Sequence, residues 1–315
     1  MKHVFIINPA AGPTDATNII KENLSKLPTD IDYEIYTTSG PGDATRFVKS
    51  LCEEGSDTYR FYACGGDGTL NEVVSGVVGF NNATIGVYPC GSGNDFIKYY
   101  GTAKDFSNIS DLVFGVEHNI DVMKVDDRYS VNMVNFGFDT AVVKTMEKVK
   151  RFKLFGGKRA YYVGIVTALI NSMKTKCRVF VDGKRIGKDS ILLCTVGNGR
   201  YIGGSFKCAP RSSNDDGLLE VCLVNPISRL KFISLIKSYT IGTHLDDPRL
   251  KNIIDYCRGR TIEVEHEDGV YYCVDGEITF AKKFKVEVLD KAIKFIIPKQ
   301  ISEKMGINNR EVVIC

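Results

Sequence analysis

The chain has 315 residues, which exceeds the usual size of one domain and favours two, each able to bury its own core. Its formal net charge of +3 is small for this length, so overall charge gives no support to a nucleic-acid-binding protein. Ten cysteines without a C-x-x-C pair and four scattered histidines exclude a zinc site, and we expect the cysteines to be reduced core residues.

The N-terminus predicts a buried strand. Its apolar run, residues 4–7, ends at Asn8-Pro9 and is too short for the hydrophobic region of a signal peptide. The uncharged stretch 73–94 is long enough to span a bilayer, but glycines, asparagines and a proline divide it into a helix end and a strand. We therefore expect a cytoplasmic protein without a transmembrane segment.

Strand and helix patterns then alternate along the first part of the chain. Apolar runs predict strands at 4–7, 33–37, 59–63 and 84–87, and helical patterns predict helices at 16–27, 42–54 and 69–78. This order predicts an α/β domain over residues 1–122, rejoined by 291–315, with a mostly parallel sheet between helices. Ligands bind such sheets at the carboxyl ends of the strands.

The pattern changes beyond about Asp121. Short β-type segments separated by Gly and Asp turns predict strands at 121–125, 130–136, 177–181, 190–196, 219–224, 261–265, 270–274 and 284–289. Helical patterns interrupt them at 161–173 and at 230–241, the latter after Ser228 as an N-cap. We expect residues 123–290 to form an antiparallel, β-sandwich-like domain.

The strongest motif follows the third predicted strand, where residues 64–72 read CGGDGTLNE. Three glycines in four positions let backbone N–H groups approach a phosphate, and the N-terminus of the following helix adds partial positive charge. The motif therefore predicts a phosphate-binding loop. The alternative is a plain glycine turn with Asp67 as the helix cap.

Two further loops repeat this arrangement. Residues 90–96, CGSGNDF, follow the next strand, and residues 8–12, NPAAG, follow the first. Adjacent loops of this kind at the carboxyl edge of a sheet predict a site for a polyphosphate and its metal ion. The sequence contains neither G-x-x-x-x-G-K-[ST] nor G-x-G-x-x-G, which excludes a P-loop enzyme and a standard dinucleotide-binding protein.

These loops, together with Ala209-Pro210, residues 197–204 (GNGRYIGG), 216–221 (DGLLEV) and 275–277 (DGE), resemble the diacylglycerol kinase catalytic domain family, in particular its bacterial soluble lipid kinases. The resemblance spans nearly the whole chain in the right order. It implies an N-terminal domain like that of NAD kinases and diacylglycerol kinases, and a C-terminal domain that binds lipid. It also implies transfer of the γ-phosphate of ATP to a lipid hydroxyl, with diacylglycerol as the first candidate and sphingoid bases, other acylglycerols or polyprenols as alternatives.

The resemblance implies roles for individual residues. ATP would bind Asn8, Pro9, Ala10, Ala11, Gly12, Thr38, Gly66, Asp67, Gly68, Thr69, Leu70, Asn71, Glu72 and Ser92. Catalysis would involve Glu277 as general base and Asp67, which with Asp95 and Asp121 would form an acidic network around the catalytic Mg²⁺. A structural Mg²⁺ would bind Asp216 and backbone oxygens of Ser213 and Leu218. Ser92 stands where the family often has threonine, and it keeps the hydroxyl.

The residues alone leave alternatives open at two of these places. Asp275-Gly276-Glu277 is typical of an ordinary hairpin turn. Asp215-Asp216-Gly217 is equally typical of a turn between strands, although a carboxylate beside a sharp glycine turn also suits a hard cation.

A basic segment, residues 148–159, combines six cationic residues with Phe152, Leu154 and Phe155. Basic side chains are attracted to anionic lipid, and apolar ones insert at the interface. We therefore expect this segment to contact an anionic membrane surface peripherally and transiently, with a solvated charged face as the alternative.

The sequence leaves two alternative functions to weigh against a lipid kinase. An NAD kinase also carries a Gly-Gly-Asp-Gly-Thr loop, but the Asp95 loop, the Asp216 turn and Glu277 favour the lipid enzyme. A non-catalytic lipid-binding protein would have lost Asp67 or Glu277, and both are present. No nucleic-acid partner is expected, and the resemblance suggests a homodimer.

Overall fold

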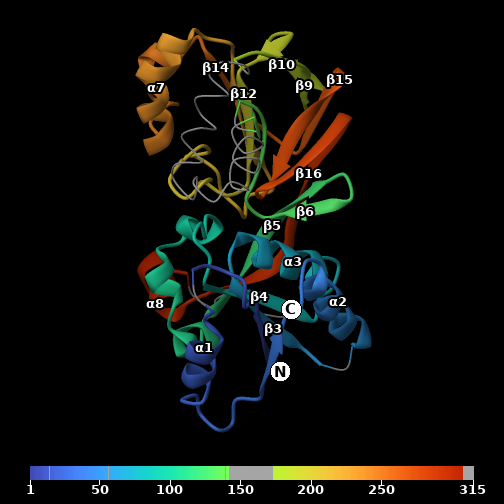
Figure 1. Ribbon diagram of the computed structural model, residues 1–315, viewed down its shortest axis with the longest axis vertical. Helices are drawn as coiled ribbons and strands as arrows, with labels where there is room; N and C mark the ends of the chain where they lie inside the picture. The colour runs from blue at the N-terminus through green and yellow to red at the C-terminus, as the bar shows by residue number, and fades with distance from the viewer. Residues whose placement is uncertain (14, 56, 139, 142–172, 308–315) are drawn as a thin grey trace, which may run out of the picture. The chain divides into compact units, whose positions relative to one another are not determined.

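The computed structural model describes residues 1–307 except 14, 56, 139 and 142–172. The chain forms two compact units, unit 1 with Met1–Val122 and Asp290–Cys315, and unit 2 with Met123–Leu289. Figure 1 follows the chain through both of them. The basic segment 148–159 and nearly all of the predicted helix 161–173 lie outside the described residues.

Unit 1 is built on a parallel sheet. Its strands are β1 (Lys2–Ile7), β2 (Tyr33–Thr37), β3 (Tyr59–Gly65), β4 (Ala83–Pro89) and the end of β16 (Glu277–Ile297), in the order β16-β4-β3-β1-β2. All four pairings are parallel. The four strands predicted in this region are confirmed, and with them the parallel α/β fold.

Helices cover both faces of this sheet (Figure 1). The helices are α1 (Thr17–Leu24), α2 (Asp43–Glu54), α3 (Asp67–Val77), α4 (Ile109–Val113) and α8 (Lys299–Met305), with 3-10 turns η1 (Phe96–Tyr99) and η2 (Ala103–Phe106). α2 and α3 lie on one side, and α1, α4 and α8 lie on the other (Figure 1). α2 and α3 approach closely because Gly76 has no side chain, and a Cβ there would lie 2.7 Å from Cβ of Val48.

Aromatic side chains fill the core of unit 1. Phe5 stacks on Tyr62 with 4.4 Å between ring centroids, and the Tyr62 hydroxyl hydrogen-bonds the buried His3 ring at 2.8 Å. Burial lowers the pKa of His3 to about 4, so this ring is neutral near pH 7. Phe295 of β16 packs edge-on against Phe96 at 5.2 Å, which anchors the returning C-terminal strand.

Unit 2 is dominated by an antiparallel sheet. Its order is β14-β13-β12-β7-β15-β16, with β5 and β6 attached at β16 and with β9 and β10 attached at β15. The bounds are β5 (Val116–Val125, which begins in unit 1 and enters unit 2 at Met123), β6 (Arg128–Ser130), β7 (Met133–Gly137), β9 (Arg178–Val181), β10 (Lys184–Ile186), β12 (Leu193–Gly197), β13 (Leu219–Val224), β14 (Ile254–Gly259) and β15 (Thr261–Val274). Two short strands, β8 (Thr175–Lys176) and β11 (Ser190–Ile191), pair separately. The predicted antiparallel, sandwich-like architecture is confirmed.

Both faces of this sheet are buried at β13. Leu219, Val221 and Leu223 enter one core cluster, while Cys222 and Val224 enter a second one on the opposite face. The second cluster includes the buried side of helix α7 (Arg229–Ile241), which is followed by the 3-10 turn η3 (Pro248–Leu250).

Strand β15 of unit 2 differs from its predicted form. The strands expected at 261–265 and 270–274 are parts of one strand, β15, whose register with β16 shifts between Glu265 and Val270. A bulge of this kind interrupts the alternation of side chains without ending the strand, so the sequence pattern reads as two segments. Among the described residues, no helix is long and apolar enough to cross a membrane.

A buried carboxylate lies on β13. Glu220 is fully buried opposite Arg258 of β14, and among the described residues neither of its oxygens has a donor in good hydrogen-bonding geometry. Burial raises the pKa of Glu220 to about 7, against smaller lowering effects of the Arg211 backbone and the Arg258 charge. The folded state therefore binds more protons than the unfolded chain between about pH 4.5 and pH 7.

We expect Glu220→Gln to stabilise the protein at pH 8 and to have a much smaller effect at pH 5. The free energy of unfolding of the wild type falls as pH rises from about 4.5 to 7, because the ionised Glu220 carboxylate is disfavoured inside the fold. Its loss relative to the Gln variant reaches at most about 3 kcal/mol. Urea denaturation at both pH values measures it, with the exposed Glu267→Gln as the control. An equal effect of Glu220→Gln on the free energy of unfolding at both pH values would contradict the raised pKa of Glu220.

Candidate functional site

Three loops meet at the carboxyl edge of the unit 1 sheet, after β1, β3 and β4. The backbone N–H of Asn8 donates to the carbonyl of Cys64 at 3.0 Å. The N–H groups of Cys90 and Gly91 both donate to the carbonyl of Gly65, at 2.8 and 3.2 Å. The predicted neighbouring loops are therefore tied together by main-chain hydrogen bonds.

Glycine residues let these loops contact one another. A Cβ at Gly91 would lie 2.5 Å from Cα of Gly66, and a Cβ at Gly12 would lie 2.0 Å from the carbonyl oxygen of Cys90. Gly12 also has a φ of +79°, which favours glycine. Gly68 is different, because a Cβ there would meet nothing within 4 Å. Gly12, Gly66 and Gly91 serve loop packing, whereas Gly68 leaves open space beside the backbone.

The N-terminus of α3 opens onto this space. The first N–H groups of a helix have no acceptor within the helix, and Gly66 at the N-cap supplies no side-chain acceptor. The Asp67 carboxylate does not cap the helix either, since its Oδ1 accepts from the N–H groups of Asp95 at 2.7 Å and Phe96 at 3.2 Å. The helix-cap alternative for Asp67 is therefore wrong.

Asp67 and Asp95 form an acidic pair around Gly93. A Cβ at Gly93 would lie 3.0 Å from Oδ2 of Asp67 and 3.7 Å from Oδ2 of Asp95, so both oxygens border the space that glycine leaves. Burial, and then the Asp95 charge, raise the pKa of Asp67 above its ordinary value. Lys98 balances part of this charge through an ion pair with Asp95 at 2.5 Å. Two carboxylates beside a vacant side-chain position fit a hard cation such as Mg²⁺.

Asp121 has a different environment. Its side chain is fully buried, and Oδ1 accepts from the backbone N–H of Lys291 at 2.7 Å, which joins β5 to the returning strand β16. Among the residues that the structure describes, no three His, Cys, Asp or Glu side chains form a set that could hold a metal ion. The network of Asp67, Asp95 and Asp121 therefore stays a prediction.

A pocket of about 260 Å³ lies beside the loops that follow β1 and β2. Its lining contains six of the predicted ATP-site residues and four that were not predicted. The predicted ones are Asn8, Pro9, Ala10, Thr38, Thr69 and Glu72, and the others are Ser39, Gly40, Pro41 and Ala44. The predicted residues Ala11, Gly12, Gly66, Asp67, Gly68, Leu70, Asn71 and Ser92 are not part of this lining. The turn signal of Gly40-Pro41, which two residues separate from the end of β2, could have pointed to the missed residues.

Hydrogen bonds hold the lining of this pocket in place. The Asn8 side-chain amide donates to Oγ1 of Thr69 at 3.1 Å. The Glu72 carboxylate accepts from the N–H groups of Gly42 at 2.9 Å and Ala44 at 3.2 Å, so it satisfies donors at the start of α2. Leu70, in contrast, is buried in the core.

Glu277 begins β16 in unit 2, directly after a turn. Its side chain is 81% exposed and forms an ion pair with Arg128 at 3.6 Å. In the turn, Asp275 has a φ of +44° and its Oδ1 accepts from the Met133 N–H at 2.9 Å. The segment is thus a hairpin turn fixed to β7, and it also presents an accessible carboxylate.

The Asp216 turn is balanced by an arginine. Asp216 forms an ion pair with Arg258, and its Oδ1 accepts from the Leu218 N–H at 3.1 Å. The Ser213 hydroxyl donates to Asp215 at 2.6 Å. These contacts fit an ion-paired turn better than a metal-ligand set, because Arg258 already supplies the counter-charge. The structural Mg²⁺ stays a prediction.

Two protein-family models match the chain. Residues 2–125 match the family model described as diacylglycerol kinase catalytic domain, and residues 132–297 match the model described as YegS C-terminal NAD kinase beta sandwich-like domain. This chain belongs to the diacylglycerol kinase catalytic domain family. The resemblance inferred from the glycine loops is confirmed.

Individual members of this family are similar over most of their length. The chain is 29% identical to a protein named diacylglycerol kinase from Bacillus subtilis (strain 168), over 93% of this chain and 96% of the relative. It is 27% identical to a protein named probable lipid kinase YegS-like from Pectobacterium atrosepticum, over 92% and 95%. The crystal structure of a diacylglycerol kinase from Bacillus anthracis strain Sterne has the same fold, with a TM-score of 0.69, 22% identity and coverage of 95% and 98%.

We expect Gly91→Ala to destabilise the protein by about 1–3 kcal/mol, because the added methyl group would overlap the backbone at Gly66. Gly68→Ala is the matched control, since its methyl group enters open space at the first turn of a helix and should not lower stability. Urea denaturation of both variants measures the difference. Equal losses of stability in the two variants would contradict the packing role of Gly91.

Proposed function

We propose that this chain is an ATP-dependent lipid kinase that transfers the γ-phosphate to a hydroxyl of a membrane lipid, with diacylglycerol as the first candidate acceptor. The observation that carries the proposal is the pair of glycine loops packed at Gly66 and Gly91, with the Asp67–Asp95 pair beside an open helix N-terminus. The names of the Bacillus subtilis and Pectobacterium atrosepticum relatives support a lipid as the acceptor.

The phosphates would bind at the start of α3. Backbone N–H groups of the first turn and the helix dipole attract anions, and the open space beside Gly68 gives a phosphate access to the main chain. The exposed Ser92 on the neighbouring loop can add a hydroxyl donor. Phosphoryl transfer depends mainly on such positioning and charge stabilisation, and needs little covalent chemistry from the protein.

The acidic pair would hold the metal ion. Asp67 and Asp95 would bind Mg²⁺ directly or through water near Gly93, and the ion would neutralise charge on the phosphates during transfer. The raised pKa of Asp67 supports this role, because a cation favours the ionised form that burial and Asp95 disfavour.

The pocket beside Asn8, Thr38 and Thr69 would receive another part of the nucleotide. At about 260 Å³ it is smaller than the roughly 300–1,000 Å³ of sites that enclose a whole drug-sized ligand. It therefore suits one portion of ATP, such as the ribose or the base, with the phosphates outside it on the glycine loops.

Glu277 would act as the general base for the acceptor hydroxyl. Its carboxylate is accessible, and its ion pair with Arg128 joins two exposed groups, an arrangement worth only about 0–1 kcal/mol. A lipid hydroxyl could therefore readily replace Arg128 as the partner of this carboxylate. The fixed Asp275 turn would keep Glu277 in position.

A panel of acceptors tests the proposal. The protein would be incubated with labelled ATP, Mg²⁺ and, in separate mixed-micelle reactions, diacylglycerol, monoacylglycerol, a sphingoid base or a polyprenol, with NAD in a reaction without lipid. A phosphorylated lipid supports the proposal and identifies the acceptor. Phosphorylation of NAD alone would favour the NAD kinase alternative, and no product in any reaction would contradict a kinase.

We expect Glu277→Gln to lower kcat on the best lipid by about 100-fold or more, since a general base typically contributes 10²–10⁴-fold. Binding of ATP should persist, because Glu277 belongs to the turn of unit 2 and not to the glycine loops. Glu267→Gln, an exposed residue of the same strand pair, is the control. Near-normal turnover in Glu277→Gln would remove this residue from the mechanism.

A further inference from the structure

Helix α7 exposes three large aliphatic side chains. Leu230 is 83% exposed, Ile233 is 58% exposed and Ile241 is 55% exposed. No other helix or strand in the described part of the chain exposes as many large hydrophobic residues. Exposed apolar side chains gathered on one element are typical of an interaction surface.

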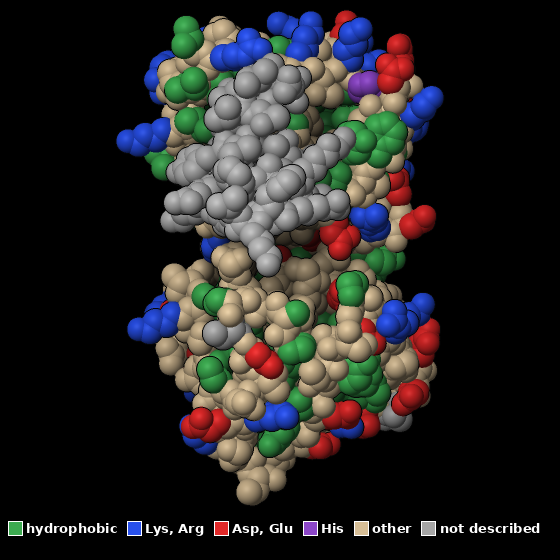
Figure 2. All heavy atoms as spheres, viewed as in Figure 1, with side chains coloured by type: hydrophobic (Ala, Val, Ile, Leu, Met, Phe, Trp, Pro, Cys, Tyr) green, Lys and Arg blue, Asp and Glu red, His purple; other side chains and the backbone are tan. Residues whose placement is uncertain are grey.

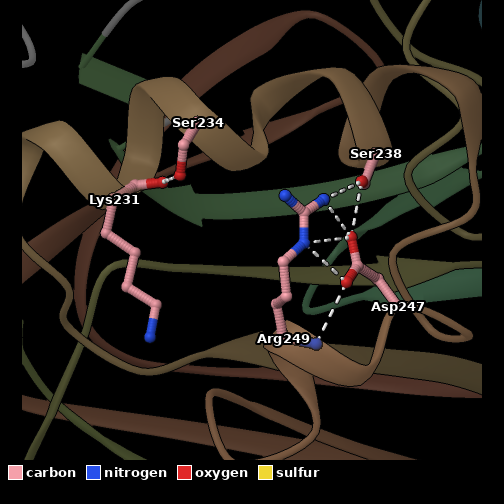
Figure 3. Close-up of polar contacts among 5 residues, drawn as sticks. All are labelled: Lys231, Ser234, Ser238, Asp247 and Arg249. Carbon is pink, nitrogen blue, oxygen red and sulfur yellow. Dashed lines mark hydrogen bonds and ion pairs between the residues drawn. The ribbon is translucent and has the colours of Figure 1, made fainter.

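The opposite side of α7 is firmly anchored, so its exposed face is a feature of a packed helix. Phe232 and Leu235 are buried in the second core cluster of unit 2, and the Phe232 ring lies 4.7 Å from that of Phe138. Ser228 caps the N-terminus by accepting from the Lys231 N–H. Near the C-terminus, the Ser238 hydroxyl donates to Asp247 at 2.8 Å (Figure 3).

The exposed residues form a row along the helix. At about 100° per residue, Leu230, Ile233, Lys237 and Ile241 fall within an arc of about 80°. Arg229 and Lys231 flank this row on its two sides. With 13 residues, α7 is about 20 Å long, so the row extends over a substantial surface.

The charges on α7 all have one sign. Residues 226–245 contain Arg229, Lys231 and Lys237 but no aspartate or glutamate. Each acidic residue that follows has its own arginine partner, Asp246 with Arg211 and Asp247 with Arg249, both at 2.6 Å. In Figure 3 the Lys231 side chain extends away from the helix, and its ammonium contacts none of the other residues drawn.

Figure 2 shows the same combination on the surface, where hydrophobic and basic side chains lie side by side at the end of unit 2 that carries α7 in Figure 1. An apolar row flanked by cations is the arrangement of a helix that lies in a membrane interface, with its aliphatic side chains among the lipid chains and its cations at the headgroups.

We propose that the face of α7 formed by Arg229, Leu230, Lys231, Ile233, Lys237 and Ile241 docks onto the surface of an anionic bilayer. The proposal rests on the proposed function, because a lipid kinase must reach an acceptor that resides in a membrane. Charge complementarity favours an anionic bilayer as the partner, because the face is basic and apolar. The proposed lipid substrate of the protein would also lie in a bilayer. This face contains none of the residues of the basic segment 148–159.

Binding to vesicles tests the proposal without requiring turnover. The whole chain would be sedimented with phosphatidylcholine vesicles that contain either no anionic lipid or about one-third phosphatidylglycerol. Lys231→Glu/Lys237→Glu should weaken binding to the anionic vesicles by about 30-fold or more, because each surface cation contributes roughly a factor of five. Leu230→Ser/Ile233→Ser should also weaken it. These substitutions change exposed residues and leave the anchored side of the helix intact.

Lys184→Glu/Lys188→Glu is the matched control, since it makes the same change in net charge at exposed lysines elsewhere in unit 2. Wild-type-like binding by this control, with weaker binding by both α7 variants, supports the proposal. Equal binding by the α7 variants and the wild type, or an equal loss in the control, overturns it. A wild-type dimer that Leu230→Ser/Ile233→Ser dissociates, with vesicle binding unchanged, would assign the face to a second copy of the chain and also overturn it.

Kinase activity on a detergent-dispersed lipid separates this proposal from the proposed function. The α7 variants should keep wild-type turnover in micelles and lose it on vesicles. Absence of turnover in micelles by the wild type would contradict the proposed kinase activity. The vesicle-binding result would still test membrane docking by α7.

Discussion

The close approach of two loops at Gly66 and Gly91, which have no side chains, is the constraint on which the rest of unit 1 depends. The Gly66 and Gly91 backbones lie in contact, and any Cβ between them would separate the ends of β3 and β4. This contact brings Asp95 to Asp67, and it leaves the first turn of α3 open beside Gly68. One steric requirement therefore places an uncapped helix N-terminus next to an acidic pair, which is the combination that the proposed metal–polyphosphate ligand needs.

Two turns of unit 2 hold the carboxylates of Glu277 and Asp216 outside the part of its sheet that is buried on both faces at β13. Asp275 fixes one turn to β7 and leaves Glu277 exposed, while Arg258 holds the Asp216 turn. α7 adds an exposed apolar row on the side opposite its anchored face, which is the surface proposed to contact lipid.

Much of the fold follows from the sequence because its signals are local. The apolar run 4–7 and the glycine-rich residues 64–68 predict a strand and a strand-to-helix connection from neighbouring residues alone. They are present as β1 and as the turn at Gly66, although β3 continues to Gly65 and α3 already begins at Asp67. The pairing of Asp216 with Arg258 depends on the register between β13 and β14, and the pocket lining at Ala44 depends on how α2 meets β2. Sequence patterns do not fix such long-range geometry. The exposed face of α7 was missed for a related reason, because Leu230 and Phe232 look equally apolar until packing buries only one of them.

A crystal structure of the whole chain with Mg²⁺ and a non-hydrolysable ATP analogue tests the central claim most directly. We predict phosphate oxygens within hydrogen-bonding distance of the first N–H groups of α3, with the metal ion near Asp67 and Asp95. A triphosphate bound elsewhere, or glycine loops that stay empty at saturating nucleotide, would contradict this prediction.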